Sequence, residues 1–235
     1  MIDIHSHILH GVDDGAKTLS DSVAVVRELV GCGVTDIIAT PHYVEDTRYT
    51  VERKENLALL KGLREKLVAE NIDVNIYLGN ELYISENILQ WLKKGVVSPL
   101  SDSKYLLVEL PLNGEYQNYE DLLLELIQFG YKVILAHPER YEIFKEDYSL
   151  LVNLWGEGVL LQCNIGSFVG KYGREALKLA RRLAKDKRIF ALGSDIHHCS
   201  RNDFIMKAQK KLAKFYSDTE IEELLVGNPS KILEK

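Results

Sequence analysis

Several residue types and patterns are scarce in this sequence. It holds three cysteines, an odd number without metal-ligand spacing, which argues against a disulfide framework. No apolar run reaches the roughly 18 residues that a membrane-spanning helix requires, and the first residues show no signal-peptide pattern. The net charge of −6 leaves no basic field of the kind that nucleic-acid binding needs. We therefore expect a cytoplasmic protein that neither inserts into a membrane nor binds nucleic acid.

Apolar runs, by contrast, are frequent in the chain of 235 residues, of which 46% are hydrophobic. This content suits a single α/β domain over residues 1–235 with a sizeable core. About seven strand-like runs alternate with amphipathic helical stretches, and this order predicts a parallel sheet. The runs cover residues 1–4, 36–39, 74–78, 105–109, 133–136, 159–163 and 189–192.

The first strand-like run ends in a candidate metal-binding motif, His5-Ser-His7. Residues two apart in an extended segment point the same way, so both imidazoles can face one point. Two imidazoles held in this way form a chelate for zinc, manganese or iron. A turn nearby adds the carboxylate of Asp14. An isolated His-x-His is more often an ordinary polar strand end, so the metal hypothesis needs further ligands at the ends of the later runs.

Histidines and carboxylates do recur where the later runs end. The full set of candidates is His5, His7, Asp14, His42, Glu81, Glu109, His137, Asp195 and His197. A barrel brings the carboxyl ends of all its strands to one face, whereas an open sheet aligns fewer of them. The spread of candidates over six run ends therefore favours a distorted parallel (β/α) barrel of about seven strands.

The number of candidates predicts more than one ion. Nine nitrogen and oxygen donors exceed a single tetrahedral site and suit two or three clustered ions with a bridging carboxylate. Carboxylate-rich sites favour manganese or iron over structural zinc, and clustered ions can generate hydroxide and hold a phosphate during in-line attack. Ordinary alternatives remain open: Glu109 can simply end a strand, and Glu81 and Asp14 can be turn residues. We interpret His10 and His198 as ordinary histidines.

Two arginines lie beside the candidate ligands. Arg140 comes three residues after His137, and Arg201 comes four after His197. A guanidinium group pairs bidentately with phosphate, so both are candidate phosphate contacts. Arg48 is a weaker third candidate.

Five motifs spread over the whole chain are specific in combination. They are Ile-Asp-Ile-His-Ser-His7, Val-Asp-Asp-Gly15, Ala-His-Pro-Glu-Arg140, Gly-Ser-Asp-Ile-His197 and Gly-Asn-Pro-Ser-Lys231. In these motifs the sequence resembles the bacterial manganese-dependent tyrosine-protein phosphatases of capsule and exopolysaccharide loci, which belong to the PHP (polymerase and histidinol phosphatase) superfamily. The resemblance implies a TIM-like PHP barrel with a site for three ions.

Carried over position by position, the resemblance assigns each candidate. It implies one ion held by His5, His7, Glu81 and Asp195, a second held by Glu81, Glu109 and His137, and a third held by Asp14, His42 and His197. Glu81 then bridges two ions, and Arg140 and Arg201 match the family's phosphate-contacting arginines. Manganese is the implied metal, with iron or zinc as alternatives. The implied partner is a tyrosine autokinase that regulates capsule or exopolysaccharide synthesis, and oligomer formation stays open.

Three other interpretations compete with a phosphotyrosine phosphatase. The same chemistry could act on a small phosphomonoester such as histidinol phosphate. An amidohydrolase-type barrel also begins with His-x-His, but it usually bridges its metals with a carbamylated lysine, and no strand-end lysine is present. A non-enzymatic protein is disfavoured by the complete ligand set. The cysteine-dependent mechanism is excluded, because none of the three cysteines has an arginine six residues later.

Overall fold

The computed structural model describes residues 1–113, 117–199 and 204–234 of the chain. Its strands are β1 (Ile2–Ser6), β2 (Asp36–Ala39), β3 (His42–Tyr43), β4 (Asn75–Leu78), β5 (Glu81–Tyr83), β6 (Tyr105–Glu109), β7 (Lys132–Ala136), β8 (Leu160–Asn164) and β9 (Ala191–Gly193). Its α-helices are α1 (Leu19–Gly31), α2 (Arg53–Ala69), α3 (Ile88–Lys94), α4 (Tyr119–Gln128), α5 (Glu142–Glu146), α6 (Tyr148–Gly156), α7 (Arg174–Lys185), α8 (Phe204–Leu212), α9 (Asp218–Glu222) and α10 (Asn228–Leu233). Four short helical turns are η1 (Leu100–Asp102), η2 (Pro138–Arg140), η3 (Ile165–Val169) and η4 (Glu223–Gly227).

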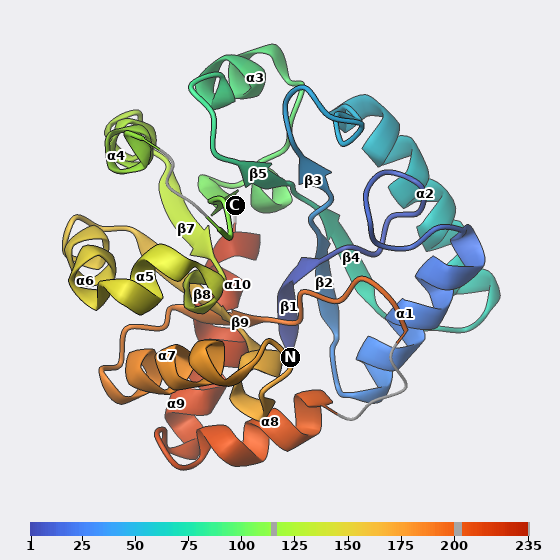
Figure 1. Cartoon of the computed structure of the whole chain (residues 1–235). Helices are drawn as coiled ribbons and strands as arrows, with labels where there is room; N and C mark the ends of the chain where they lie inside the picture. Colours follow the sequence, from blue (N-terminus) through green and yellow to red (C-terminus); the bar gives the residue numbers. More distant parts are fainter. Residues whose placement is uncertain (114–116, 200–203, 235) are drawn as a thin grey trace.

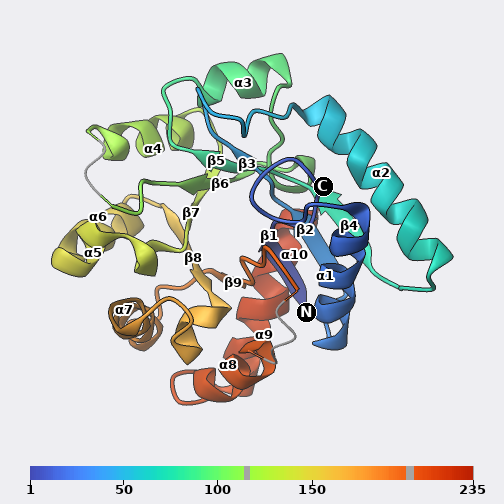
Figure 2. The ribbon, with the colours of Figure 1, turned by 45° about the vertical axis from the view of Figure 1, so that its right-hand side comes forward.

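The strands lie at the centre and most helices surround them (Figures 1 and 2). All pairings between these strands are parallel, as the β-then-α order predicts. They form one sheet in the order β1-β2-β4 and a second in the order β3-β5-β6-β7-β8-β9. The two sheets together make the distorted barrel, which confirms the expected fold class.

Nine strand segments correspond to the seven runs of the sequence, because two strands are each interrupted once. Between β2 and β3 the chain passes Pro41, which has no N–H to donate, and between β4 and β5 it passes Gly79 and Asn80. The parallel hydrogen bonds continue across both breaks. Gly79 N donates to Ala39 O at 2.8 Å, and Glu81 N donates to Pro41 O at 3.2 Å. β2 and β3 therefore act as one strand of the barrel, as do β4 and β5.

The barrel closes between β9 and β1 at the end where the candidate ligands lie. Ser6 bridges to Ile196, and the amide of His7 donates to the carbonyl of Ile196 at 3.0 Å. The amide of Asp195 donates to the carbonyl of His5 at 2.9 Å. These bonds hold the segments after β1 and β9 side by side, so the first motif of the sequence meets the Gly-Ser-Asp-Ile-His197 motif.

The hydrophobic core has an outer and an inner part. The outer part lies between the strands and the helices, and the inner part fills the barrel with side chains that include Ile4, Ile38, Leu107 and Ile134. Leu100 of η1 and Ile232 of α10 belong to the inner part. Apolar side chains therefore fill the interior of the barrel, as is usual for this fold. The polar side chains lie at one end of it.

No helix in the three described stretches of the chain is both long and apolar enough to cross a membrane. That residues 1–235 form a single domain stays a prediction.

Candidate metal centre

The described candidates from the sequence gather at one end of the barrel. His5 lies in β1, Glu109 ends β6, His137 comes directly after β7, and Asp195 and His197 come after β9. His42 and Glu81 come after β2 and β4, as the sequence suggested, and they also open the short strands β3 and β5, where they face each other in the strand register. Arg201 lies outside the described residues.

The first group of donors comes from β1, β5 and the segment after β9. The Nε2 atoms of His5 and His7 lie 3.2 Å apart, and they lie 3.0 and 3.2 Å from Glu81 Oε2. Asp195 Oδ1 lies 3.7 Å from His5 Nε2 and 3.6 Å from His7 Nε2. Ligands bonded to one ion at about 2.1 Å stand roughly 3–3.5 Å apart, so these four side chains have the spacing of one coordination sphere.

Glu81 also belongs to a second group. Its Oε1 lies 3.0 Å from His137 Nε2, and that nitrogen lies 3.6 Å from Glu109 Oε1. The two oxygens of Glu81 thus face two different sets of donors. This is the geometry of a bridging carboxylate between neighbouring ions.

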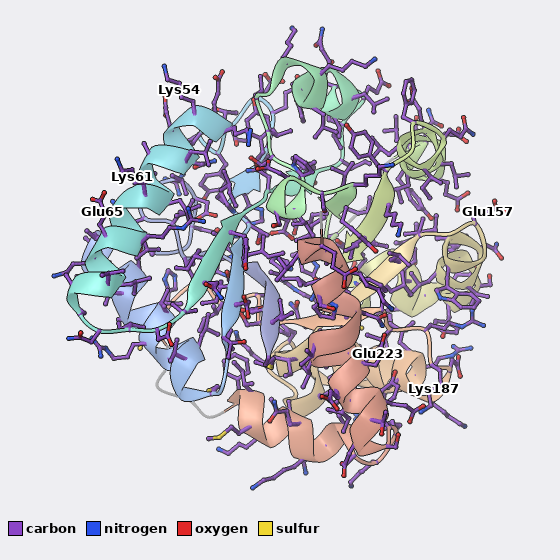
Figure 3. All side chains as sticks on the ribbon, turned by 180° about the vertical axis from the view of Figure 1, so that it is seen from behind. Lys54, Lys61, Glu65, Glu157, Lys187 and Glu223 are labelled. Atoms are coloured by element: carbon purple, nitrogen blue, oxygen red, sulfur yellow. The ribbon has the colours of Figure 1, made fainter. Side chains whose placement is uncertain are left out.

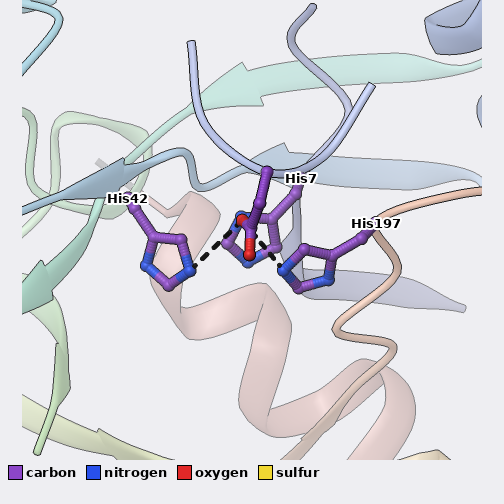
Figure 4. A group of neighbouring side chains, drawn as sticks. His7, His42 and His197 are labelled. Atoms are coloured by element: carbon purple, nitrogen blue, oxygen red, sulfur yellow. Dashed lines mark ion pairs between the residues drawn. The ribbon is translucent and has the colours of Figure 1, made fainter. Parts of the chain in front are cut away.

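The third group surrounds Asp14 (Figure 4). Asp14 Oδ1 lies 3.4 Å from His197 Nε2 and 3.7 Å from His42 Nε2. His7 adjoins this group as well, because its ring stacks on that of His197 with 3.9 Å between the centroids. One ligand atom from each of these four residues lies within 4.8 Å of the others. The three groups are therefore contiguous.

The protons on His5 and His7 are fixed by their outer neighbours. Asp13 Oδ2 lies 2.8 Å from His7 Nδ1, and a carboxylate only accepts, so Nδ1 carries the proton. Asn164 Nδ2 donates to Asp195 Oδ2 at 2.6 Å. The other amide atom of Asn164, Oδ1, therefore accepts from Gln162 Nε2 at 2.9 Å. Gln162 Oε1 then accepts from His5 Nδ1 at 2.9 Å. In their neutral forms, both histidines thus turn an unprotonated Nε2 toward Glu81.

When both imidazoles are neutral, three buried acceptors converge and no hydrogen-bond donor lies between them. Glu81 is fully buried, and its Oε2 has no hydrogen-bond partner in the described structure. Such a group costs several kcal/mol in a protein interior unless it meets a positive charge. A cation between Glu81, His5 and His7 removes this cost, so the residues fit a metal. Bonds from Nδ1 to a carboxylate or amide are also what orients metal-binding histidines.

The electrostatics of the cluster lead to the same conclusion. Burial raises the pKa of Glu109 well above its ordinary value, and the nearby carboxylates of Glu81 and Asp195 raise it further. Burial opposes the charge of Glu81 as well, but the surrounding histidines lower its pKa well below the ordinary value. For His7, burial would lower the pKa, and Asp13 and Glu81 more than reverse this. The cluster therefore attracts positive charge.

Sequence reasoning missed the residues that orient the ligands, namely Asp13, Gln162 and Asn164. Asp13 also accepts from the backbone amides of Gly15 at 2.9 Å and His42 at 3.1 Å, which fixes the loop after β1. Asp13 was visible beside Asp14 in the sequence. Gln162 and Asn164 are polar residues in an otherwise apolar strand, and that is the feature that could have identified them.

The backbone is constrained at the same end of the barrel. His137 and Asp195 have left-handed conformations, with φ of 31° and 47°, which non-glycine residues rarely adopt. Gly193 is required by close approach, because a Cβ there would lie 2.7 Å from His5 Cβ and 2.8 Å from Gln162 Nε2. The strand ends are thus packed tightly around the candidate ligands.

Arg140 lies at the mouth of the site. Its Nη1 donates to Asp195 Oδ2 at 2.8 Å, and its guanidinium lies 4.7 Å from the ring centroid of Tyr172. It is partly exposed and lines a cavity of about 380 Å³ together with candidate ligands and the side chains of Tyr49, Tyr83 and Leu112. A phosphate in this cavity can contact Arg140. Arg48 is exposed and lines a neighbouring cavity instead.

Fold and site together define a β/α barrel protein with a candidate metal-binding cluster of histidines and carboxylates. The family model for capsular polysaccharide synthesis, CpsB/CapC, matches residues 1–234, and the chain belongs to this family.

Named relatives agree with this assignment. The tyrosine-protein phosphatase YwqE of Bacillus subtilis is 34% identical over 97% of this chain and 92% of its own. The tyrosine-protein phosphatase CpsB of Streptococcus pneumoniae is 31% identical over 99% of this chain and 98% of its own.

Solved structures give the same picture. A chain from the crystal structures of YwqE and CpsB, described as metal-dependent tyrosine phosphatases, has a TM-score of 0.92 and 33% identity. It covers 99% of this chain and 94% of its own. The histidinol phosphate phosphatase of Lactococcus lactis, at a TM-score of 0.61 and 16% identity over 91% of this chain and 92% of its own, shares the fold alone.

Proposed function

We propose that this protein is a metal-dependent phosphotyrosine-protein phosphatase. The observation that carries the proposal is Glu81 Oε2, which is fully buried, has no hydrogen-bond partner in the described structure, and is faced at 3.0 and 3.2 Å by the Nε2 atoms of His5 and His7. Membership of a family whose relatives are named tyrosine-protein phosphatases supplies the substrate class. The histidinol phosphate alternative has no comparable support, because its structural likeness extends only to the fold.

The proposed ligands are those of the three groups. One ion is held by His5, His7, Glu81 and Asp195, a second by Glu81, Glu109 and His137, and a third by Asp14, His42 and His197. Two or three manganese ions suit this mixture of imidazole and carboxylate, with iron or zinc as alternatives. When bound, such ions supply hydroxide at neutral pH and positive charge for the phosphate oxygens.

The chain's own residues contribute binding and orientation. Arg140 already donates to Asp195, so its guanidinium lies where it can donate a second N–H to a phosphate oxygen. Arg201, which lies outside the described residues, is proposed as a further phosphate contact. The side chains of Tyr49, Tyr83 and Leu112 line the cavity and can hold the phenyl ring of phosphotyrosine. His42 has Tyr49 stacked 6.0 Å away, which continues the aromatic wall to the ligands.

The specific partner that we propose is a bacterial tyrosine autokinase that controls capsule or exopolysaccharide synthesis, met in the cytoplasm. Support comes from the family description, capsular polysaccharide synthesis. Assembly of the protein into an oligomer is compatible with this role.

The test combines metal analysis with a comparison of substrates. Protein loaded with manganese should contain two or three ions per chain and hydrolyse a phosphotyrosine peptide much faster than the matching phosphoserine peptide or histidinol phosphate. A single ion per chain would disprove the multi-ion site. Faster hydrolysis of histidinol phosphate than of phosphotyrosine would disprove the substrate class.

A further inference from the structure

A second cavity lies beside the metal centre and shares part of its wall. Asp14 and Tyr49 line both the metal-centred cavity and this neighbour, which has a volume of about 610 Å³. The other residues that line the second cavity are Gly11, Val12, Asp13, Lys17, Arg48 and His198. A peptide whose phosphotyrosine enters the first cavity can therefore place a neighbouring side chain in the second.

Two cations, Lys17 and Arg48, line the second cavity together with the carboxylates of Asp13 and Asp14. Lys17 and Arg48 are exposed, and within the described ranges neither forms an ion pair with a carboxylate. The two carboxylates of the cavity are engaged elsewhere: Asp13 accepts from His7, and Asp14 pairs with His197. The chain as a whole carries a net charge of −6, so two exposed cations side by side with the reaction centre are a local departure from its average.

Both cations stand on turns that hydrogen bonds close. The amide of Val44 donates to Tyr49 O at 2.8 Å, and Arg48 Nη2 donates to the Tyr49 hydroxyl at 3.0 Å. On the other side, the amide of Gly11 donates to Ala16 O at 2.8 Å, immediately before Lys17. The turns fix the backbone positions of both residues, and the bond to Tyr49 also holds the guanidinium of Arg48, which lowers the entropic cost of binding an anion there.

The metal-centred cavity has one described arginine, Arg140, and its lining side chains Tyr83 and Leu112 are uncharged. The second cavity adds Lys17 and Arg48 on the side of Tyr49, which lines both cavities.

We propose that the second cavity binds an anionic residue next to the phosphotyrosine of the substrate. The anion is a carboxylate or a second phosphate group, held by Lys17 and Arg48. This inference rests on the proposed phosphotyrosine phosphatase activity and adds the substrate's flanking sequence to it.

The experiment compares manganese-loaded protein on p-nitrophenyl phosphate and on four phosphotyrosine peptides. Two peptides carry a glutamate pair, either before or after the phosphotyrosine; the third carries glutamine in both places, and the fourth has phosphoserine in the preferred place. One glutamate peptide should have a kcat/KM roughly three- to tenfold higher than the glutamine peptide, mostly because its KM is lower. A factor of this size corresponds to the free energy of one or two exposed ion pairs. The preference should shrink as ionic strength rises from about 0.05 to 0.5 M.

The variants Lys17→Ala and Arg48→Ala, alone and combined, identify the cations. The combined variant should lose the preference and still hydrolyse p-nitrophenyl phosphate at the original rate. The matched control is Lys61→Ala, which removes an exposed lysine from the outer face of α2 (Figure 3) and should change neither value. A stronger preference for the phosphoserine peptide than for the glutamate peptide would identify the anion as phosphate.

Three results would overturn the inference. The first is an equal rate on the glutamate and glutamine peptides, and the second is a preference for glutamate that persists in the combined variant. The third is that Arg48→Ala loses hydrolysis of p-nitrophenyl phosphate as well as the preference, which would place Arg48 on the reacting phosphate. Failure of the proposed function looks different, because then no phosphotyrosine substrate is hydrolysed at all.

Discussion

Replacement of Arg140 by alanine should slow hydrolysis without emptying the metal site. The guanidinium donates to Asp195 Oδ2 at 2.8 Å, so it lies at the edge of the ligand cluster without being a ligand. The charge on the phosphate oxygens spreads further in the transition state of phosphoryl transfer, and a fixed guanidinium stabilises that state more than the bound substrate. Loss of one such donor costs about two to four orders of magnitude in kcat. This corresponds to roughly 3–5 kcal/mol.

The structure also predicts why the metal should remain. Asp195 Oδ2 keeps the bond from Asn164 at 2.6 Å when Arg140 is gone, and Asp195 Oδ1 is the atom that faces His5 and His7. The carboxylate therefore stays oriented. Arg140→Lys should recover only part of the rate, because an ammonium is a point charge without the planar fork.

The assay measures kcat, KM and bound metal together for Arg140→Ala and Arg140→Lys. An unchanged kcat with a raised KM would assign Arg140 to binding that is equal in substrate and transition state. Loss of metal in step with activity would show that Arg140 supports the ligand cluster, and either result would refute the catalytic role.

The same geometry supports four further predictions. Glu81→Gln and His137→Ala should abolish hydrolysis while circular dichroism stays native, because both side chains lie at the open end of the barrel; near-native turnover with manganese present would contradict the ligand assignment. Asp13→Asn should weaken metal binding by about 10- to 100-fold, the usual effect of losing a carboxylate that orients a histidine ligand, and a titration with manganese would detect an unchanged affinity. Replacement of all three cysteines by alanine should leave activity largely intact whereas a chelator removes it, because burial raises the pKa of the Cys163 thiol well above its ordinary value and disfavours a thiolate; inactivation by an alkylating reagent that substrate prevents would argue otherwise. In metal-free protein the folded state raises the pKa of His7, so protonation of His7 stabilises the fold, fully below about pH 6.5. This stabilisation is lost as the pH rises from about 6.5 through the raised pKa, and the melting temperature should fall over that range. The melting temperature of metal-loaded protein should instead rise with pH, because protons compete with the metal for the ligands. If the melting temperatures of both forms changed with pH in parallel, this would count against the site.

The alternation of apolar runs and helical stretches was enough to predict the strands and the barrel. It could not predict the interruptions at Pro41 and at Gly79, because the hydrogen bonds that carry the sheet across them come from neighbouring strands. Nor could it predict α10, whose Ile232 enters the inner core, since a six-residue helix shows little periodicity. The sequence likewise carried no sign of the second cavity, whose walls come from loops far apart in the chain.

Most of the candidate ligands on strands lie at positions that follow from the alternation of side chains along a strand. Side chains two apart in a strand share a face, so an apolar residue inside the barrel predicts an inward residue two or four positions later. Ile38 leads in this way to His42, Leu107 to Glu109, and Ala191 to Asp195. The same count from the half-buried Leu160 gives Gln162 and Asn164, two of the three orienting residues that sequence reasoning missed.

Three candidate ligands, His5, His7 and His137, break the count at two places, and each break has a local cause. From Ile4 the next inward position would be Ser6, but the pairing of β1 with β2 shifts between Asp3 and Ser6, and His5 and His7 face the cluster instead. From Ala136 the next inward position would be Pro138, but the left-handed backbone of His137, with φ of 31°, brings that side chain to Glu81. The left-handed backbone of His137 is strained, and such strain persists where the surrounding structure fixes it. A regular strand would have turned this imidazole away from Glu81.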